Sequence, residues 1–150
     1  MPTTTDHSPA DLVRWLMVRA GVGTDPSQSG AWPVWVSKEP TVPDNLIKVT
    51  DTQGVDGSRS MVDGDQIAWN GFQVMVRAVD HPTGWQKVNE VRTAFLTDAN
   101  FKRTVVTVEG QRYAVQAVVR VGQAIPLGEE KPVSSRNLFT LNAMLSYRKL

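Results

Sequence analysis

Two long runs of alternating apolar and polar residues occupy the last third of the chain and constrain its fold more than any other feature. In the first run, Arg112–Val121, every odd position is apolar. In the second run, Asn137–Arg148, the apolar positions are Phe139, Leu141, Ala143, Leu145 and Tyr147. A period of two residues is typical of half-buried β-strands. The second strand would extend about 40 Å at ~3.4 Å per residue, which is difficult for a small domain to cover alone. The pattern therefore favours a protein that assembles with copies of itself.

The composition narrows the class of protein. The chain has 150 residues, which fits one domain, and its 16 basic and 15 acidic side chains give a net charge of +1. This balance argues against a dedicated polyanion binder. The absence of cysteine excludes disulfides, thiolate catalysis and sulfur-ligated zinc. No apolar run approaches the ~20 residues of a membrane span, and Met1–Ser8 lacks the features of a signal peptide, so we expect a protein assembled in a cytoplasm.

Two helices are predicted from capping residues and helical spacing. Ser8 is a candidate N-cap, Pro9 suits the first helical position, Asp11 favours the positive helix end, and Gly21 supplies the stop. The apolar stripe of this helix is Leu12, Val13, Leu16, Met17 and Ala20. A second helix is expected from Pro82, with His81 as its cap and Trp85, Val88, Val91 and Phe95 at spacings of three and four.

Shorter strands are predicted at 32–37, 46–52, 72–80 and 104–108, with a tight turn at Glu109-Gly110. We expect residues 53–66 to form a long loop and residues 1–8 to be flexible. The order of elements predicts a single α+β domain over residues 1–150, with a mainly antiparallel twisted sheet and two α-helices packed on one face.

Catalytic and metal chemistry find little support in the sequence. We expect His7 to lie in a frayed terminus and His81 to serve the second helix. A calcium site around Asp51, Asp56, Asp63 and Asp65 is one hypothesis, but their spacing matches no EF-hand and acidic residues beside glycines are ordinary turn formers. The five tryptophans are scattered, which favours core and interface positions over a stacking surface. We predict no catalytic residue, no cofactor and no metal.

Three basic residues on the predicted strands are interpreted as solvated side chains. They are Arg77, Arg112 and Arg120. The alternative, that they line a channel, stays open.

Three segments together resemble a protein family. The first runs from Pro43-Asp44-Asn45-Leu46-Ile47 through Val49 to Asp51-Thr52-Gln53-Gly54. The second is Phe72-Gln73-Val74-Met75-Val76-Arg77 with a helix ending near Leu96. The third is Leu127-Gly128-Glu129-Glu130, a short loop, and Ser135–Asn142. In order and spacing they resemble the minor capsid and tail-terminator proteins of tailed bacteriophages, from about Asp11 to Arg148.

The resemblance implies a virion protein without catalytic residues, assembled in the host bacterial cytoplasm. Its subunits would form a ring, expected to be a homohexamer, at the head-proximal end of the tail. Its partners would be the tail tube protein and a head-connector or head-closure protein. No membrane and no specific nucleic-acid binding are expected, although genome DNA would pass through the ring.

Subunit contacts are expected at the long final strand and at the charged loop before it, through side chains and free strand edges. The candidate contact residues are Gly128, Glu129, Glu130, Lys131, Arg136, Asn142 and Arg148.

Two alternatives stay open. One is another head–tail junction protein, such as a head-closure or adaptor ring component. The other is a small ligand-binding or enzymatic α+β domain, which would need a concave pocket lined by converging polar groups such as His81 and the loop aspartates.

Overall fold

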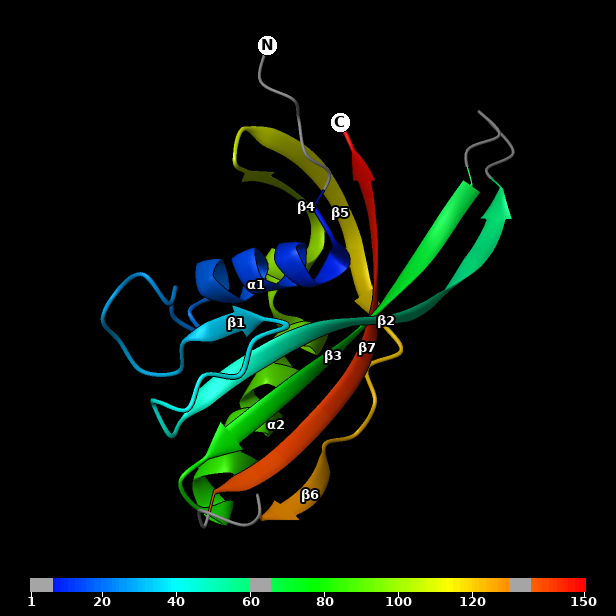
Figure 1. Ribbon diagram of the computed structural model, residues 1–150. Coiled ribbons are helices and arrows are strands. Elements are labelled where there is room, and N and C mark those ends of the chain that lie inside the picture. Colours follow the sequence, from blue (N-terminus) through cyan, green and yellow to red (C-terminus); the bar gives the residue numbers. More distant parts are fainter. Residues whose placement is uncertain (1–6, 60–65, 130–135) are drawn as a thin grey trace.

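The computed structural model describes residues 7–59, 66–129 and 136–150. Within these residues, seven strands form one sheet in the order β1-β2-β3-β7-β5-β4, with β6 beside β7 (Figure 1). The helices are α1 (Pro9–Ala20), α2 (His81–Thr97) and the 3₁₀ turn η1 (Ala99–Phe101). The strands are β1 (Val34–Val36), β2 (Leu46–Arg59), β3 (Gln66–Ala78), β4 (Lys102–Val108), β5 (Gln111–Val119), β6 (Ile125–Glu129) and β7 (Asn137–Lys149).

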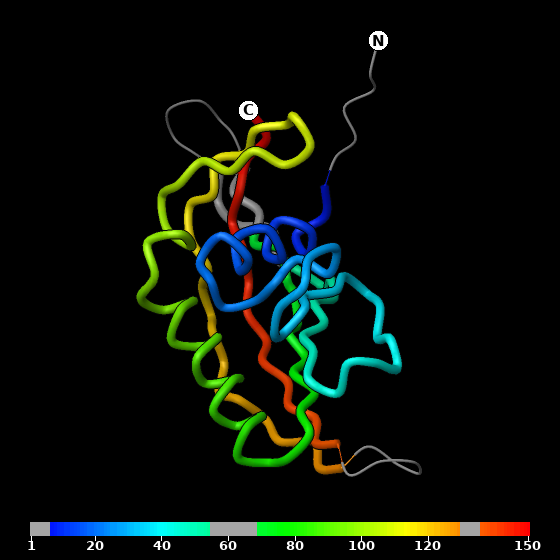
Figure 2. The backbone as a smooth tube through the Cα atoms, turned by 90° about the vertical axis from the view of Figure 1, so that its left-hand side faces the viewer, coloured from blue at the N-terminus to red at the C-terminus, as the bar shows by residue number. Residues whose placement is uncertain are grey.

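The predicted α+β class is confirmed, with one refinement. Every strand pair is antiparallel except β1 with β2, so the sheet is mixed although mainly antiparallel. Both helices lie on the same side of the curled sheet, as the two perpendicular views show (Figures 1 and 2). One buried cluster contains Leu16 of α1, Val91 of α2 and the inward residues of the strands between them. The sheet therefore has a helix-covered face and a helix-free face.

The predicted ends of α1 are confirmed. Ser8 and Asp11 form a capping box, in which the Ser8 hydroxyl accepts a bond from the Asp11 backbone N–H and the Asp11 carboxylate accepts one from the Ser8 backbone. Gly21 ends the helix in the left-handed conformation that glycine adopts without strain. Residues Leu12, Val13, Leu16 and Met17 are fully buried, as their spacing indicated.

The second helix begins differently from the prediction. Asp80, and not His81, is its N-cap, because the Asp80 carboxylate accepts a bond from the Thr83 backbone N–H at 2.9 Å. His81 lies inside the first turn, where its ring stacks on Trp85. Gly84 of the same turn lies against the ring of Phe139 on β7, so this helix approaches the sheet more closely than a side chain would allow.

The predicted long loop over residues 53–66 is wrong in its larger part. Residues 53–59 continue β2 and Gln66 begins β3, so the two strands form a long antiparallel ribbon, while residues 60–65 lie outside the described part of the chain. The register shifts between Thr52 and Val55 and again between Asp56 and Arg59. Gly54 lies in the first of these irregularities, directly against the backbone of Trp69. Gly54 therefore belongs to a bulge within a strand and not to a turn.

The expectation of a flexible segment at residues 1–8 is wrong for its last two residues. Ser8 caps α1, and the side chain of His7 lies within 2.8 Å of the Tyr113 hydroxyl while its backbone N–H donates to the same oxygen at 3.0 Å. Residues 1–6 lie outside the described residues. The Tyr147 hydroxyl donates to the His7 carbonyl, so β5 and β7 both hold the chain where it enters α1.

The contact between Gly84 and Phe139 gives a stability prediction. We expect Gly84→Ala to destabilise the protein, because overpacking costs about 1–3 kcal/mol whereas replacing a helical glycine by alanine gains only about 1 kcal/mol. Urea denaturation of this variant should show a lower midpoint, with Gln86→Ala on the exposed side of α2 as the control. Combining Gly84→Ala with Phe139→Leu should give a favourable coupling energy, and strict additivity of the two changes would contradict the contact.

Candidate functional site

The residues considered for chemistry do not converge. His7 is held by Tyr113 and lies 3.3 Å from Glu109, whereas His81 stacks on Trp85 at the start of α2. Asp51 accepts a bond from the backbone N–H of Ala10, and Asp63 and Asp65 lie outside the described residues. Within the described ranges, no group of three His, Asp or Glu side chains is arranged to hold a metal ion. No helix in those ranges has the length and apolar character needed to cross a bilayer.

The predicted contact residues are spread along the sheet. Gly128 and Glu129 on β6 pair with the first residues of β7, close to Arg136. Asn142 is exposed in the middle of β7, where its side-chain oxygen accepts a bond from Gln73, and Arg148 is exposed near the far end. Glu130 and Lys131 lie outside the described residues. Because β7 is a long strand, Arg136 and Arg148 are about 40 Å apart at ~3.4 Å per residue, and the predicted residues cannot form one patch.

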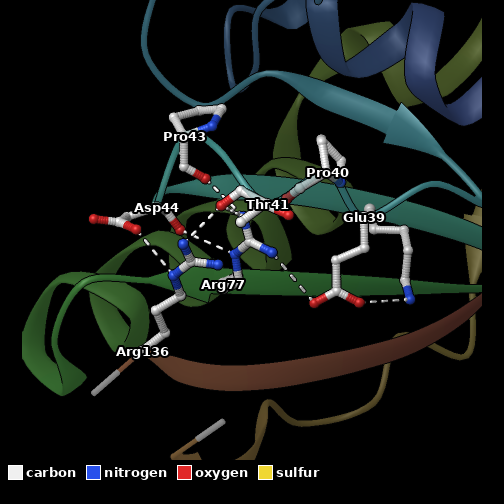
Figure 3. Close-up of polar contacts among 8 residues, drawn as sticks. Glu39, Pro40, Thr41, Pro43, Asp44, Arg77 and Arg136 are labelled. Atoms are coloured by element: carbon white, nitrogen blue, oxygen red, sulfur yellow. Dashed lines mark hydrogen bonds and ion pairs between the residues drawn. The ribbon is translucent and has the colours of Figure 1, made fainter. Parts of the chain in front are cut away.

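Arg77 is the most unusual residue near the β6 end of the sheet. The prediction of a solvated side chain is wrong: Arg77 is 1% exposed on the helix-free face, at the end of β3. Its guanidinium donates to the backbone carbonyl oxygens of Pro40, Thr41 and Pro43, at 2.6, 3.2 and 2.7 Å. A further bond reaches the carbonyl of Asp44, and Glu39 lies 3.5 Å away (Figure 3). The segment between β1 and β2 thus wraps around one arginine.

A second arginine holds the same segment from the start of β7. Arg136 lies 2.9 Å from the Asp44 carboxylate through Nε and donates to the Thr41 carbonyl at 2.6 Å (Figure 3). Thr41 and Asp44 therefore each bond to both arginines. We call residues 39–44, together with Arg77 and Arg136, the arginine-held loop. Guanidinium groups suit this task because their donors are planar and spread over several directions.

Large exposed aliphatic side chains gather at the same end of the sheet. Val42, between two residues bonded to Arg77, is 72% exposed, and Val79 follows the last residue of β3. Ile125 and Leu127 belong to β6, whose residues are all exposed. We call these four residues the β6-end aliphatic group. Glu39, Asp44, Glu129 and Arg136 lie in the same segments or directly before β7, so this end of the sheet exposes both apolar and charged side chains, as protein-binding surfaces do.

Two strand edges that could mediate subunit contacts, those of β6 and β4, are partly protected against pairing with another strand. Pro126 removes one backbone donor from β6, and the register of β6 shifts between Pro126 and Gly128. On β4, the carbonyl of Val105 accepts a bond from Arg19 at 3.1 Å. Proline, bulges and charged side chains are devices by which proteins protect sheet edges from pairing. These two edges therefore favour contacts through side chains over the addition of a strand.

A shallow cleft of about 660 Å³ lies elsewhere, between the start of α1, β1 and the Glu109 turn. Most of its charged groups have structural partners: Asp11 caps α1, Arg14 lies 3.8 Å from Asp25, and Glu109 lies beside His7. The backbone N–H and the hydroxyl of Ser27 lower the pKa of Asp25, as Arg14 does to a smaller extent. Neither His81 nor the predicted loop aspartates line this cleft, so it differs from the pocket that a ligand-binding role was expected to need.

Sequence reasoning missed the arginine-held loop. The alternation through β3 placed Arg77 on the polar face, but nothing in the pattern indicated that this face is covered at that point. One signal was present in the sequence, the pair Pro40 and Pro43 within a short connection, which restricts the backbone and exposes carbonyl groups.

Comparison with known proteins supports the fold alone. No family model matches the chain, and no curated protein matches it. One matching solved structure shares 15% sequence identity with a TM-score of 0.50, and the match covers 92% of this chain and 94% of the other. The name of that protein states no function. The match indicates that the whole arrangement of elements, and not a fragment, recurs in another protein.

The cage around Arg77 gives a second prediction. We expect Arg77→Lys to lower the unfolding free energy by about 2–3 kcal/mol, because an ammonium group cannot reach several carbonyls in one plane and bonds to a charged group contribute about 1.5–3 kcal/mol each. The matched control is Arg112→Lys on an exposed position, which should stay within about 0.5 kcal/mol of the parent. Equal urea midpoints for both variants would mean that the cage contributes no stability.

Proposed function

We propose that this chain is a structural subunit of a tailed bacteriophage, a tail terminator that forms a ring at the head-proximal end of the tail. The ring would cap the tail tube and join it to a head-connector or head-closure protein. Support comes from the ordered resemblance of three segments to the minor capsid and tail-terminator family. The single α+β domain and the long β7 strand are compatible with that resemblance.

The observation that carries the proposal is the β6-end aliphatic group beside the arginine-held loop. Single exposed aliphatic side chains are ordinary, but Val42, Ile125 and Leu127 are each about half or more exposed at one end of the sheet. The loop that presents Val42 is held by five hydrogen bonds from Arg77 and Arg136 to backbone oxygens. A surface that is ordered before binding loses less entropy when a partner docks, which favours assembly.

The proposed mechanism is geometric and needs no reactive group, cofactor or metal. Identical subunits in a ring meet through heterologous contacts that close by rotation. The β6 end of one subunit would contact a different surface of its neighbour, and six such contacts are proposed to complete the ring. A closed ring covers the growing end of the tube and offers no equivalent surface to another tube ring.

Another head–tail junction protein is the close alternative, because a head-closure or adaptor ring would use the same kind of contact. Loss of the chain distinguishes the two roles. In a phage that encodes it, we expect infection without the chain to give overlong or unjoined tails beside filled heads, seen by electron microscopy. Leaky heads with tails of normal length would indicate the closure role, and normal virions that lack the protein would end both proposals.

The aliphatic group provides a test at the level of one residue. Leu127→Glu should abolish complementation of a phage that lacks the chain, because a carboxylate would be buried in the proposed contact. Leu96→Glu is the matched control, since Leu96 is 43% exposed on α2 and Leu127 is 54% exposed on β6. Both variants should keep the parent circular dichroism spectrum and urea midpoint. Full complementation by Leu127→Glu would remove β6 from the contact surface.

A further inference from the structure

A recess of about 320 Å³ lies on the β1 side of the sheet, beside the arginine-held loop. Most of its lining residues are apolar, and these are Ala31, Trp32, Pro33, Pro43 and Val79. A concave surface lined mainly by apolar groups, with few polar ones, suits an apolar side chain. We call this feature the Trp32 recess.

Hydrogen bonds within the chain hold the walls of the Trp32 recess in place. The hydroxyl of Thr24 donates to the Ala31 carbonyl at 2.6 Å, and the backbone N–H of Thr24 donates to the Trp32 carbonyl at 3.0 Å. The side-chain oxygen of Asn45 accepts a bond from the Val79 backbone N–H at 2.9 Å. The arginine-held loop supplies a further wall. The recess is therefore formed before anything binds, so that little entropy is lost in shaping it around a partner.

The backbone of Trp32 indicates that the recess has a use beyond folding. Its φ of 61° is a left-handed conformation, which is uncommon for a bulky residue. The ammonium group of Lys87 lies 5.4 Å from the centroid of the Trp32 ring, a cation–π contact that helps to fix the ring. Strained residues of this kind persist only where their surroundings hold them, and they gather at binding and active sites.

The opposite edge of the sheet exposes an aliphatic side chain at the same level (Figure 1). Leu46, which adjoins the recess, pairs with Arg77. Arg77 pairs with Leu138, and Leu138 pairs with Gly128 of β6. Three strand spacings of ~4.8 Å put Gly128 about 14 Å from Leu46. Leu127, which is 54% exposed, is thus level with the recess but separated from the recess of its own chain by the width of the sheet.

The charges of the two edges are complementary as well. Residues 24–54, which include β1 and the start of β2, contain four acidic and two basic residues. A second row of paired residues crosses the sheet from Thr52 on β2 to Val119 on β5. Exposed Asp51 adjoins one end of this row, and exposed Arg120 adjoins the other. A second copy that docks sideways at the same level would bring its Arg120 toward the acidic edge, which favours that orientation.

We infer that the Trp32 recess receives Leu127 from β6 of a second copy of this chain. The inference rests on the proposed function, in which the β6 end of one subunit meets a different surface of its neighbour, and it identifies that surface. Because the two edges differ, the contact is heterologous, and repetition of it can close a ring.

The test is cross-linking between two single-cysteine variants, since the parent chain has no cysteine. Ala31→Cys, in the recess wall, and Glu129→Cys, two residues after Leu127, are mixed at about 1 mM each, a concentration that populates even a weak contact. A short bismaleimide should join the two variants to each other much faster than it joins either variant to itself. Leu96→Cys, at an exposed position of α2, replaces Glu129→Cys in the control mixture and should give only the slow background reaction.

A second change tests the role of Leu127 itself. Adding Leu127→Glu to the Glu129→Cys variant should lower the cross-linking rate by at least about tenfold, because the contact would bury an unpaired carboxylate. Adding Leu96→Glu instead should leave the rate unchanged, and equal urea midpoints of the two variants exclude unfolding as the cause of a loss.

Three results would overturn the inference. They are a mixed product that forms no faster than the self-linked products, a mixed product that forms equally fast in the Leu96→Cys control, and an equal loss caused by Leu96→Glu. The cross-linking needs no phage, so its outcome is separate from that of the infection experiment. Overlong tails without the mixed product would contradict the recess alone, and the mixed product beside normal virions that lack the chain would contradict the terminator role alone.

Discussion

The pairing of β7 on both of its edges is the constraint on which the rest of the structure depends. One edge pairs with β3 from Asn137 to Leu145, and the other pairs first with β6 and then with β5. In the described part of the chain, β7 is the strand that joins the β1-β2-β3 part of the sheet to β5 and β4. The α2 helix also packs against the inward side chains of β7, which include Phe139 and Leu141. The length that made this strand conspicuous in the sequence is thus used within one subunit.

The sequence predicts those elements whose signals are local, and it misses those that depend on pairing with a distant strand. Alternation and capping predicted α1, α2, β4, β5 and β7, because those signals are local and each pattern is typical of one kind of element. The long ribbon of β2 and β3 was missed because Gly54, Gly57 and several aspartates are also typical of turns. Only the register shows that Gly54 lies in a bulge, against the backbone of Trp69. The prediction lacked β6 because this strand is short, contains Pro126 and Gly128, and owes its existence to the free edge of β7.

Arg77 and Arg112 show that the sequence pattern does not predict whether a polar side chain on a strand is buried. Both occupy polar positions of an alternating strand, and nothing in the sequence distinguishes them. Arg77 is enclosed because the connection between β1 and β2 folds across its end of the sheet and directs several carbonyl oxygens toward it. Arg112 lies at the opposite end of the same face, where it stays exposed. The contact residues predicted at Gly128, Glu129 and Arg136 fall in the neighbourhood of the first arginine, and Arg148 falls beside the second.

The two ends of the helix-free face therefore expose different kinds of side chain. This difference bears on which end would contact a neighbouring subunit in the proposed ring. The β6 end combines aliphatic side chains with charges of both signs, which suits a protein partner. The β4–β5–β7 end carries exposed Arg112 and Arg148 beside neutral polar residues such as Thr107 and Gln116. Pairing with an added strand is disfavoured at β6 by Pro126 and the register shift, and at β4 by the bond from Arg19 to the Val105 carbonyl. A neighbouring subunit would therefore have to recognise side chains. In the proposed ring, the β6 end would therefore meet a neighbouring subunit through side chains, on an ordered loop that is already in place before the contact forms.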